Sequence, residues 1–190
     1  MPIVHYSEAE IEGLKQVVEL MAISARTAPK TRGVDEVVTA MVSGIEKDAI
    51  ADEMVKHSGQ KRVPLSGFVR DADNLRRSPF CLLVGVRGKQ PKRPENPLNC
   101  GACGYETCNE FIRAEKKIGE DFEGPLCIWH SVDLGIAMAS AVKTAAELNT
   151  DNRIMYTIGA AAKSLNLIEA DVIVGIPISA SGKNIYFDRK

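Results

Sequence analysis

The sequence lacks any hydrophobic run long enough to cross a bilayer. Its longest apolar stretches, FCLLVGV at 80–86 and DVIVGIPISA at 171–180, fall well short of the roughly 20 residues that a membrane helix needs. The N-terminal segment, MPIVHYSEAE, also lacks the basic start and the apolar stretch of a signal peptide. We therefore expect a cytoplasmic protein that has no membrane partner.

A surplus of charge of either sign is also missing. The 190 residues include 24 basic and 25 acidic side chains, which gives a net charge of −1. Bulk electrostatic binding to nucleic acid or to an anionic membrane surface requires a clear basic surplus. We therefore expect no nucleic-acid partner.

Cysteine is scarce but concentrated. There are five cysteines, and three of them lie within the segment NCGACGYETCNEF at 99–111. In a reducing compartment, clustered cysteines bind metal more often than they form disulfides. An odd number suits four ligands and one spare cysteine. Cys81 lies inside an apolar run and is expected to be the spare, a small buried hydrophobic residue.

Composition and length indicate an ordinary globular protein. Hydrophobic residues make up 45% of the chain and charged residues 26%, a typical balance for a soluble fold. The length suits one domain. We expect a single α+β domain over 1–190, with helices around a small mixed sheet and a cluster-binding insert at 98–130.

Hydrophobic periodicity predicts five helices and two buried strands. Ser7 and Glu10 have the S-x-x-E spacing of a capping box, and Asp151 is expected to cap the last helix. Gly44 is a point where the second helix could divide. The expected helices span 8–25, 34–57, 109–122, 131–148 and 151–167, and the expected strands span 80–86 and 171–179.

Four cysteines have a spacing that suits a 4Fe–4S cluster, C-x2-C-x4-C-x18-C. A cube of this type takes four thiolates, one for each iron. The C-x2-C pair supplies two thiolates from one tight loop, where Gly101 and Gly104 allow the main chain to come close. The third cysteine begins an expected helix, whose N-terminus favours an anionic cluster. The four expected ligands are Cys100, Cys103, Cys108 and Cys127.

Zinc is an alternative for the same cysteines. A zinc ion accepts four cysteines, or three cysteines and a histidine, and His130 follows Cys127 at C-x2-H spacing. Structural zinc sites usually have two short knuckles, whereas here three cysteines crowd one loop and the fourth stands alone. This pattern favours a cube over a single ion. A group of metal-free thiols is the third alternative.

These residues also carry a resemblance to known iron–sulfur proteins. CGACGYETC, followed by a helix and the lone Cys127, resembles the 4Fe–4S motif of corrinoid iron–sulfur proteins and of Rnf-type electron-transfer subunits. In those proteins the last gap is slightly shorter than the 18 residues found here. The whole chain resembles a family of ferredoxin-domain-containing proteins of unknown function from archaea and anaerobic bacteria. SARTAPKTRGVDEV and IPISASGKNIYFDRK are the stretches that suggest it.

Segments outside the cysteine motif resemble a flavin-binding nitroreductase scaffold. ARTAPKTRG at 25–33, the small-residue helix from Asp133 and the segment at 165–179 carry this resemblance. It implies that cationic side chains meet the phosphate of a bound FMN, as they commonly do. The implied FMN contacts are Arg26, Lys30 and Arg32. The sequence departs from the family pattern at Lys30, where a serine is usual, and at Gly33, where an asparagine would hold the isoalloxazine.

The cysteine spacing and these resemblances together predict electron transfer through one 4Fe–4S cluster to an unidentified redox partner protein. The small-residue helix can pack closely against a neighbour, and we expect a homodimer. Two other classes stay open. One is a flavin-dependent oxidoreductase fed by the cluster, and the other is a binding module with a structural zinc.

Overall fold

The core of the fold is a four-stranded sheet. Its strands are β1 (Val37–Ser43), β2 (Phe80–Val86), β5 (Asp151–Asn152) and β6 (Val172–Ser179). In the computed structural model, which describes residues 3–62 and 66–187, they lie in the order β1–β2–β6–β5. Every pairing is antiparallel, so the fold is α+β as expected but the sheet is not mixed.

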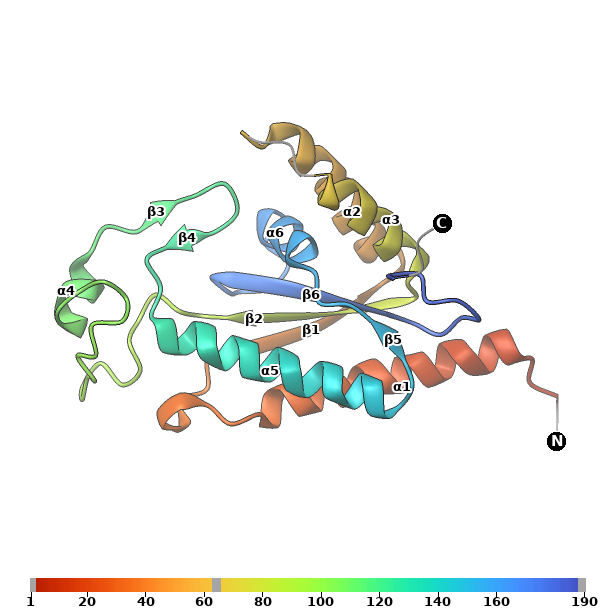
Figure 1. Ribbon diagram of the computed structural model, residues 1–190, viewed down its shortest axis with the longest axis horizontal. Coiled ribbons are helices and arrows are strands. Elements are labelled where there is room, and N and C mark those ends of the chain that lie inside the picture. Colours follow the sequence, from red (N-terminus) through yellow and green to blue (C-terminus); the bar gives the residue numbers. More distant parts are fainter. Residues whose placement is uncertain (1–2, 63–65, 188–190) are drawn as a thin grey trace.

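Helices cover both faces of this sheet (Figure 1). The helices are α1 (Tyr6–Thr27), α2 (Gly44–Gln60), α3 (Gly67–Arg77), α5 (Ile128–Glu147) and α6 (Tyr156–Ser164). Leu82 and Val84 of β2 pack against α1 and α5, whereas Cys81 and Leu83 pack in the cluster formed with α2, α3 and α6. Burial from both sides explains why β2 is a continuous apolar run. It also confirms that Cys81 is a buried residue, with no exposed surface.

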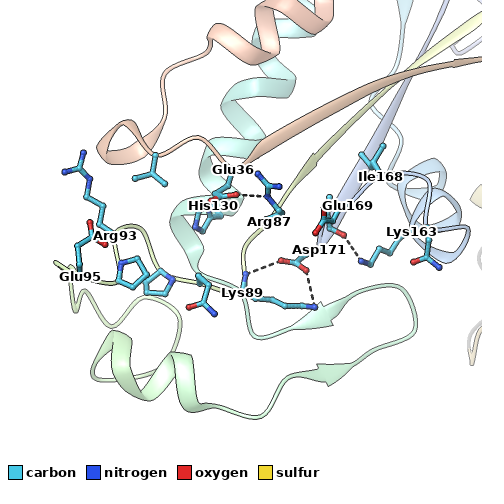
Figure 2. A pocket seen from close by; sticks show the side chains of 16 residues that line it. Glu36, Arg87, Lys89, Arg93, Glu95, His130, Lys163, Ile168, Glu169 and Asp171 are labelled. Atoms are coloured by element: carbon cyan, nitrogen blue, oxygen red, sulfur yellow. Dashed lines mark hydrogen bonds and ion pairs between the residues drawn. The ribbon is translucent and has the colours of Figure 1, made fainter.

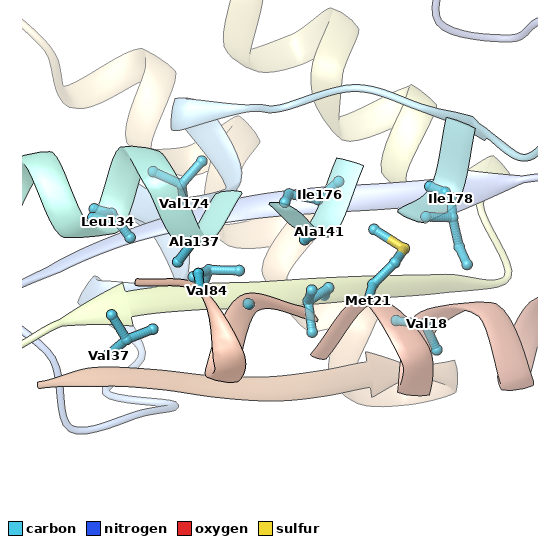
Figure 3. Packing of buried hydrophobic residues seen from close by; sticks show 14 of the residues in the cluster. Val18, Met21, Val37, Val84, Leu134, Ala137, Ala141, Val174, Ile176 and Ile178 are labelled. Carbon is cyan, nitrogen blue, oxygen red and sulfur yellow. The ribbon is translucent and has the colours of Figure 1, made fainter. Parts of the chain in front are cut away.

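Small residues allow the α1–α5 layer to pack closely onto the sheet. Ala137, Ala141 and Ala145 recur at every fourth position of α5 and are fully buried, which places them on one face of the helix. Val18 and Met21 of α1 lie in the same hydrophobic cluster (Figure 3).

On the opposite face, α6 approaches β6 through two glycines. A Cβ atom added at Gly159 would lie 1.7 Å from the carbonyl oxygen of Ile173. A Cβ atom added at Gly175 would lie 2.2 Å from Cγ2 of Ile158. Both distances are far below van der Waals contact, so each position requires glycine.

The helix expected at 34–57 is wrong over its first part. Val37 and Val38 fit a helical face, yet this segment pairs along its length with β2, with Val37 opposite Val86. Gly44 has a φ of +54° and is the first residue of α2, directly after the end of β1 at Ser43. A left-handed backbone of this kind suits glycine, and the expected helix does divide at this point.

Other boundaries differ as well. The helix expected at 109–122 ends after six residues as α4 (Cys108–Arg113), and β3 (Lys117–Ile118) and β4 (Glu123–Gly124) then form a hairpin. No capping box forms at Ser7, because α1 begins after His5 with no side-chain cap. Asp151 caps no helix and lies in β5. The helices expected at 8–25 and 131–148 and both expected strands are confirmed.

Within residues 3–62 and 66–187, none of the helices combines the length and the apolar character that crossing a membrane would require.

Candidate metal centre

The four predicted cysteine ligands line one cavity. The segment between β2 and α5 lies beyond one end of the sheet and carries α4 and the β3–β4 hairpin (Figure 1). The side chains of Cys100, Cys103, Cys108 and Cys127 all border the same cavity there, together with Phe111 and Trp129 among others. Cys127 is buried, Cys103 and Cys108 are half-buried, and Cys100 is exposed. Folding therefore brings together the lone fourth cysteine and the crowded three.

Backbone turns hold the first three cysteines on one loop. Gly101 and Gly104 have φ values of +72° and +88°, which glycine adopts at little cost. The Gly104 N–H donates to the Gly101 carbonyl at 2.9 Å, which closes the turn around Cys103. The side-chain oxygen of Asn99 accepts a hydrogen bond from the Cys108 N–H at 2.9 Å. Asn99 thus joins the two ends of the cysteine loop.

The helix that begins at Cys108 is fixed by its own cap. The hydroxyl of Thr107 accepts from the Glu110 N–H at 3.2 Å. The carboxylate of Glu110 accepts from the Glu106 N–H at 3.1 Å. Two main-chain donors at the start of α4 are satisfied in this way, as in a capping box. The expectation that a helix begins at Cys108 is confirmed.

Cys127 is held against the end of β2. Its N–H donates to the Gly88 carbonyl at 2.9 Å, and its own carbonyl accepts from the His130 N–H at 3.1 Å. Cys127 directly precedes α5, so the fourth cysteine is placed by a helix that packs on the sheet.

Trp129 contacts the exposed cysteine. Its indole N–H donates to the Cys100 sulfur at 3.3 Å. A hydrogen bond from the main chain of Ala102, followed by that of Trp129, lowers the pKa of the Cys100 thiol. Donors of this kind stabilise a thiolate.

The described residues do not form a compact site for a single ion. In the parts of the chain that the structure describes, no three His, Cys, Asp or Glu side chains gather closely enough to hold one metal ion. His130, the histidine of the zinc alternative, lines a different cavity. It is 2% exposed and its Nδ1 has no hydrogen-bond partner. Burial and the charge of Lys92 lower its pKa to about 4.

That second cavity lies beside the first and has a volume of about 990 Å³. It opens between the segment that follows β2 and the loop that precedes β6 (Figure 2). Ion pairs cross its wall, with Arg87 bonded to Glu36 at 2.7 Å and Lys89 to Asp171 at 3.2 Å. Pro91 lines both cavities, so the two cavities adjoin at this segment.

Of the three basic residues of the flavin resemblance, Arg26 lies in the last turn of α1, and Lys30 and Arg32 lie on the segment that follows it. All three are bonded to main-chain oxygens. Arg26 donates to the Val37 carbonyl at 2.8 Å and pairs with Asp35 at 3.0 Å. Lys30 donates to the carbonyls of Ala28 and Arg26. Arg32 donates to the Asn96 carbonyl. A phosphate would have to compete with these contacts.

Comparison with known proteins gives the family. A model of uncharacterized proteins containing a ferredoxin domain matches residues 123–189, and a model for an Fe–S cluster matches residues 97–116. An uncharacterized protein from Archaeoglobus fulgidus is 47% identical over 180 residues, which cover 94% of this chain and 92% of that protein.

Solved structures give the fold. A nitroreductase with bound FMN from Desulfitobacterium hafniense has a TM-score of 0.56 at 14% identity, over 88% of this chain and 78% of that one. Nitroreductase A from Vibrio parahaemolyticus has a TM-score of 0.53 at 13% identity, over 90% of this chain. This chain covers only 60% of the length of the Vibrio protein.

The chain belongs to the family of uncharacterized proteins that contain a ferredoxin domain, and it is an iron–sulfur protein with a nitroreductase-like fold.

Proposed function

We propose that this chain transfers electrons through one 4Fe–4S cluster bound by four cysteines. The observation that carries the proposal is the single cavity lined by Cys100, Cys103, Cys108 and Cys127. The first three cysteines are close together in the sequence. The fourth, Cys127, is separated from Cys108 by α4 and the β3–β4 hairpin.

The arrangement of the cysteines favours a cube over zinc. A zinc ion requires all of its ligands about 2.3 Å from one point when they are thiolates. A cube instead takes each thiolate at a separate corner. The four cysteines border one cavity, and three of them come from one loop while the fourth comes from the start of α5. His130 lines the neighbouring cavity, and this position also weakens the zinc alternative.

The residues of the cavity would shape the redox properties of the site. A bound cube supplies a one-electron carrier, and its potential depends on hydrogen bonds to sulfur and on exposure to water. Phe111 and Cys127 are buried and exclude water on the protein side. Trp129 donates to the Cys100 sulfur on the exposed side. We place the contact with a redox partner protein on this side, because Cys100 is the exposed member of the four cysteines.

Metal analysis of single variants tests the proposal. Protein prepared anaerobically should contain about four irons and four sulfides per chain, with broad absorbance near 400 nm. Cys108→Ser should lose the cluster, whereas Cys81→Ser should keep it, since Cys81 is buried among hydrophobic residues in the core. Stoichiometric zinc in iron-replete preparations, or equal loss from both variants, would overturn the ligand assignment.

A flavin-dependent oxidoreductase is the second candidate. The structure from Desulfitobacterium hafniense that shares the fold has FMN bound. In this chain a cavity of about 990 Å³ adjoins the cysteine cavity, so a bound ring would lie near the cluster. The phosphate contacts implied by the resemblance, Arg26, Lys30 and Arg32, are not among the residues that line this cavity, so the phosphate would have to extend beyond it to reach them. We propose that two copies of the chain form the site as a homodimer.

Calorimetric titration with FMN tests this candidate. Losing one charged hydrogen-bonding partner costs about 1.5–3 kcal/mol, so Arg26→Ala should weaken FMN binding by roughly one to two decades. Arg76→Ala is the matched control, because Arg76 of α3 pairs with the exposed side chains of Asp52 and Asp73. Absence of binding at high micromolar FMN would leave the cluster as the sole redox centre. Light scattering of the same sample gives the oligomeric state.

A further inference from the structure

A buried ion pair joins the two halves of the cysteine set. The ammonium of Lys92 lies 2.5 Å from a carboxylate oxygen of Asp133, and each side chain is 1% exposed. Lys92 belongs to the segment that leads from β2 to Cys100, and Asp133 lies on α5, which begins directly after Cys127. The pair therefore connects the loop with three cysteines to the helix that places the fourth.

Both members of the pair have further hydrogen bonds. Lys92 donates to the Val34 carbonyl at 2.9 Å. The second carboxylate oxygen of Asp133 accepts from the N–H of Thr31 at 2.9 Å and from its hydroxyl at 2.8 Å. These partners lie on η1 (Thr31–Gly33) and just after it, so a third segment is tied to the pair. Buried charges that are hydrogen-bonded from several segments in this way hold one geometry.

The two charges of the pair differ in their position relative to the cysteines. Lys92 lies in the wall of the cysteine cavity, whereas Asp133 is not among the residues that line it. The pair therefore lies beside the cavity, and its basic member is the one that borders it. In a protected interior both charges act on the cavity, because the Coulomb energy between charges is much larger than in water.

Reduction of a cluster adds one negative charge to the cavity. A cation in the wall stabilises the reduced form and raises the reduction potential, since local charge is one of the factors that set the potential of an iron–sulfur site. A buried ion pair contributes little to stability compared with well-packed apolar residues. Stability alone is therefore a poor explanation for placing two charges here.

We propose that the Lys92–Asp133 pair sets the reduction potential of the cluster through the two charges that it places beside the cysteine cavity. The proposal rests on the proposed function, because it requires a cluster bound at the four cysteines.

Potentiometric titration followed by EPR tests the pair directly. Lys92→Met keeps the aliphatic stem and removes the positive charge, so the midpoint potential should become more negative. Asp133→Asn leaves the lysine without its counter-charge, so the potential should become more positive. Lys92→Arg keeps the charge and should stay close to wild type. Opposite shifts for the first two variants are the expected result, and a role limited to packing would not produce them.

An exposed ion pair on the same helix supplies the control. Lys143 and Glu147 are 71% and 61% exposed, so Lys143→Met and Glu147→Gln should leave the potential unchanged. Shifts of the same sign in Lys92→Met and Asp133→Asn, or no shift in either, would overturn the proposal. If Lys92→Met fails to assemble, Asp133→Asn decides alone, and an unchanged or more negative potential would refute it. An iron-free wild type would instead refute the proposed function.

Discussion

Replacing Asp121 with asparagine is expected to loosen the hairpin that leads to Cys127. Asp121 lies in the turn between β3 and β4, and its side chain is 9% exposed. Its carboxylate accepts from Lys61 at 2.5 Å and from the imidazole of His57 at 2.5 Å. The hydroxyl of Tyr156 donates to the same carboxylate. One side chain thus ties the hairpin to the end of α2 and to the start of α6.

The magnitude follows from the burial of the partner. Lys61 is 5% exposed, and its remaining acidic partner is Glu120, at 3.5 Å and 38% exposed. Removing one member of a buried pair costs about 3–5 kcal/mol because the other charge stays buried. The residual contact with Glu120 puts the expected loss near the lower end, about 3 kcal/mol. For a chain of this length, 1 kcal/mol shifts Tm by about 2–4 °C, so Asp121→Asn should lower Tm by about 6–12 °C.

Thermal unfolding followed by circular dichroism measures the change. Asp73→Asn is the control, since Asp73 is 69% exposed and its loss should shift stability by no more than about 0.5 kcal/mol. The double variant with Lys61→Met should lose less than the sum of the two single losses, because the buried lysine charge is gone. Strict additivity, or a Tm shift no larger than that of the control, would refute the reasoning.

The other predictions concern packing and reactivity. Gly159→Ala should cost more than about 3 kcal/mol, because its Cβ would meet the Ile173 carbonyl at 1.7 Å. Gly13→Ala, with open space around it, should stabilise α1 by about 0.5–1 kcal/mol, and denaturant unfolding compares the two. Burial raises the pKa of Cys81 to about 12, so about one thiol in ten thousand is ionised at pH 8. Mass spectrometry of cluster-free protein treated with iodoacetamide should find Cys100 modified and Cys81 intact, and equal modification would contradict the burial of Cys81.

The cysteine motif could be anticipated because its chemistry is local. The spacing of Cys100, Cys103 and Cys108 and the two glycines between them determine a turn that needs no distant partner. The buried strands could be anticipated for a similar reason, because short apolar runs such as 80–86 report burial on both faces of a sheet. The four cysteines line one cavity in the structure, which is consistent with the prediction that they form one site.

Long-range pairing limited the rest of the fold prediction. The apolar residues of 34–45 recur at three- and four-residue intervals, which is the pattern of a helix face. The segment from Val37 to Ser43 nevertheless forms a strand, because β2 offers it a pairing edge from Ser43–Phe80 to Val37–Val86. Cross-strand partners of this kind are set by tertiary structure, so periodicity within the segment could not reveal them.

Long-range contacts also limited the prediction of the charged residues around the cysteine segment. In the sequence, Asp133 and Asp121 are ordinary acidic residues at helix-like positions, and nothing near them marks a buried partner. The structure places Lys92 and Lys61 against them from segments 41 and 60 residues away. Both pairs connect the segment between β2 and α5 to the helical layers, one at the cysteine cavity and one at the hairpin. The motif thus predicts which sulfur atoms would bind iron, whereas these two distant pairs, which only the structure reveals, are expected to decide how firmly the segment that carries the cysteines is held.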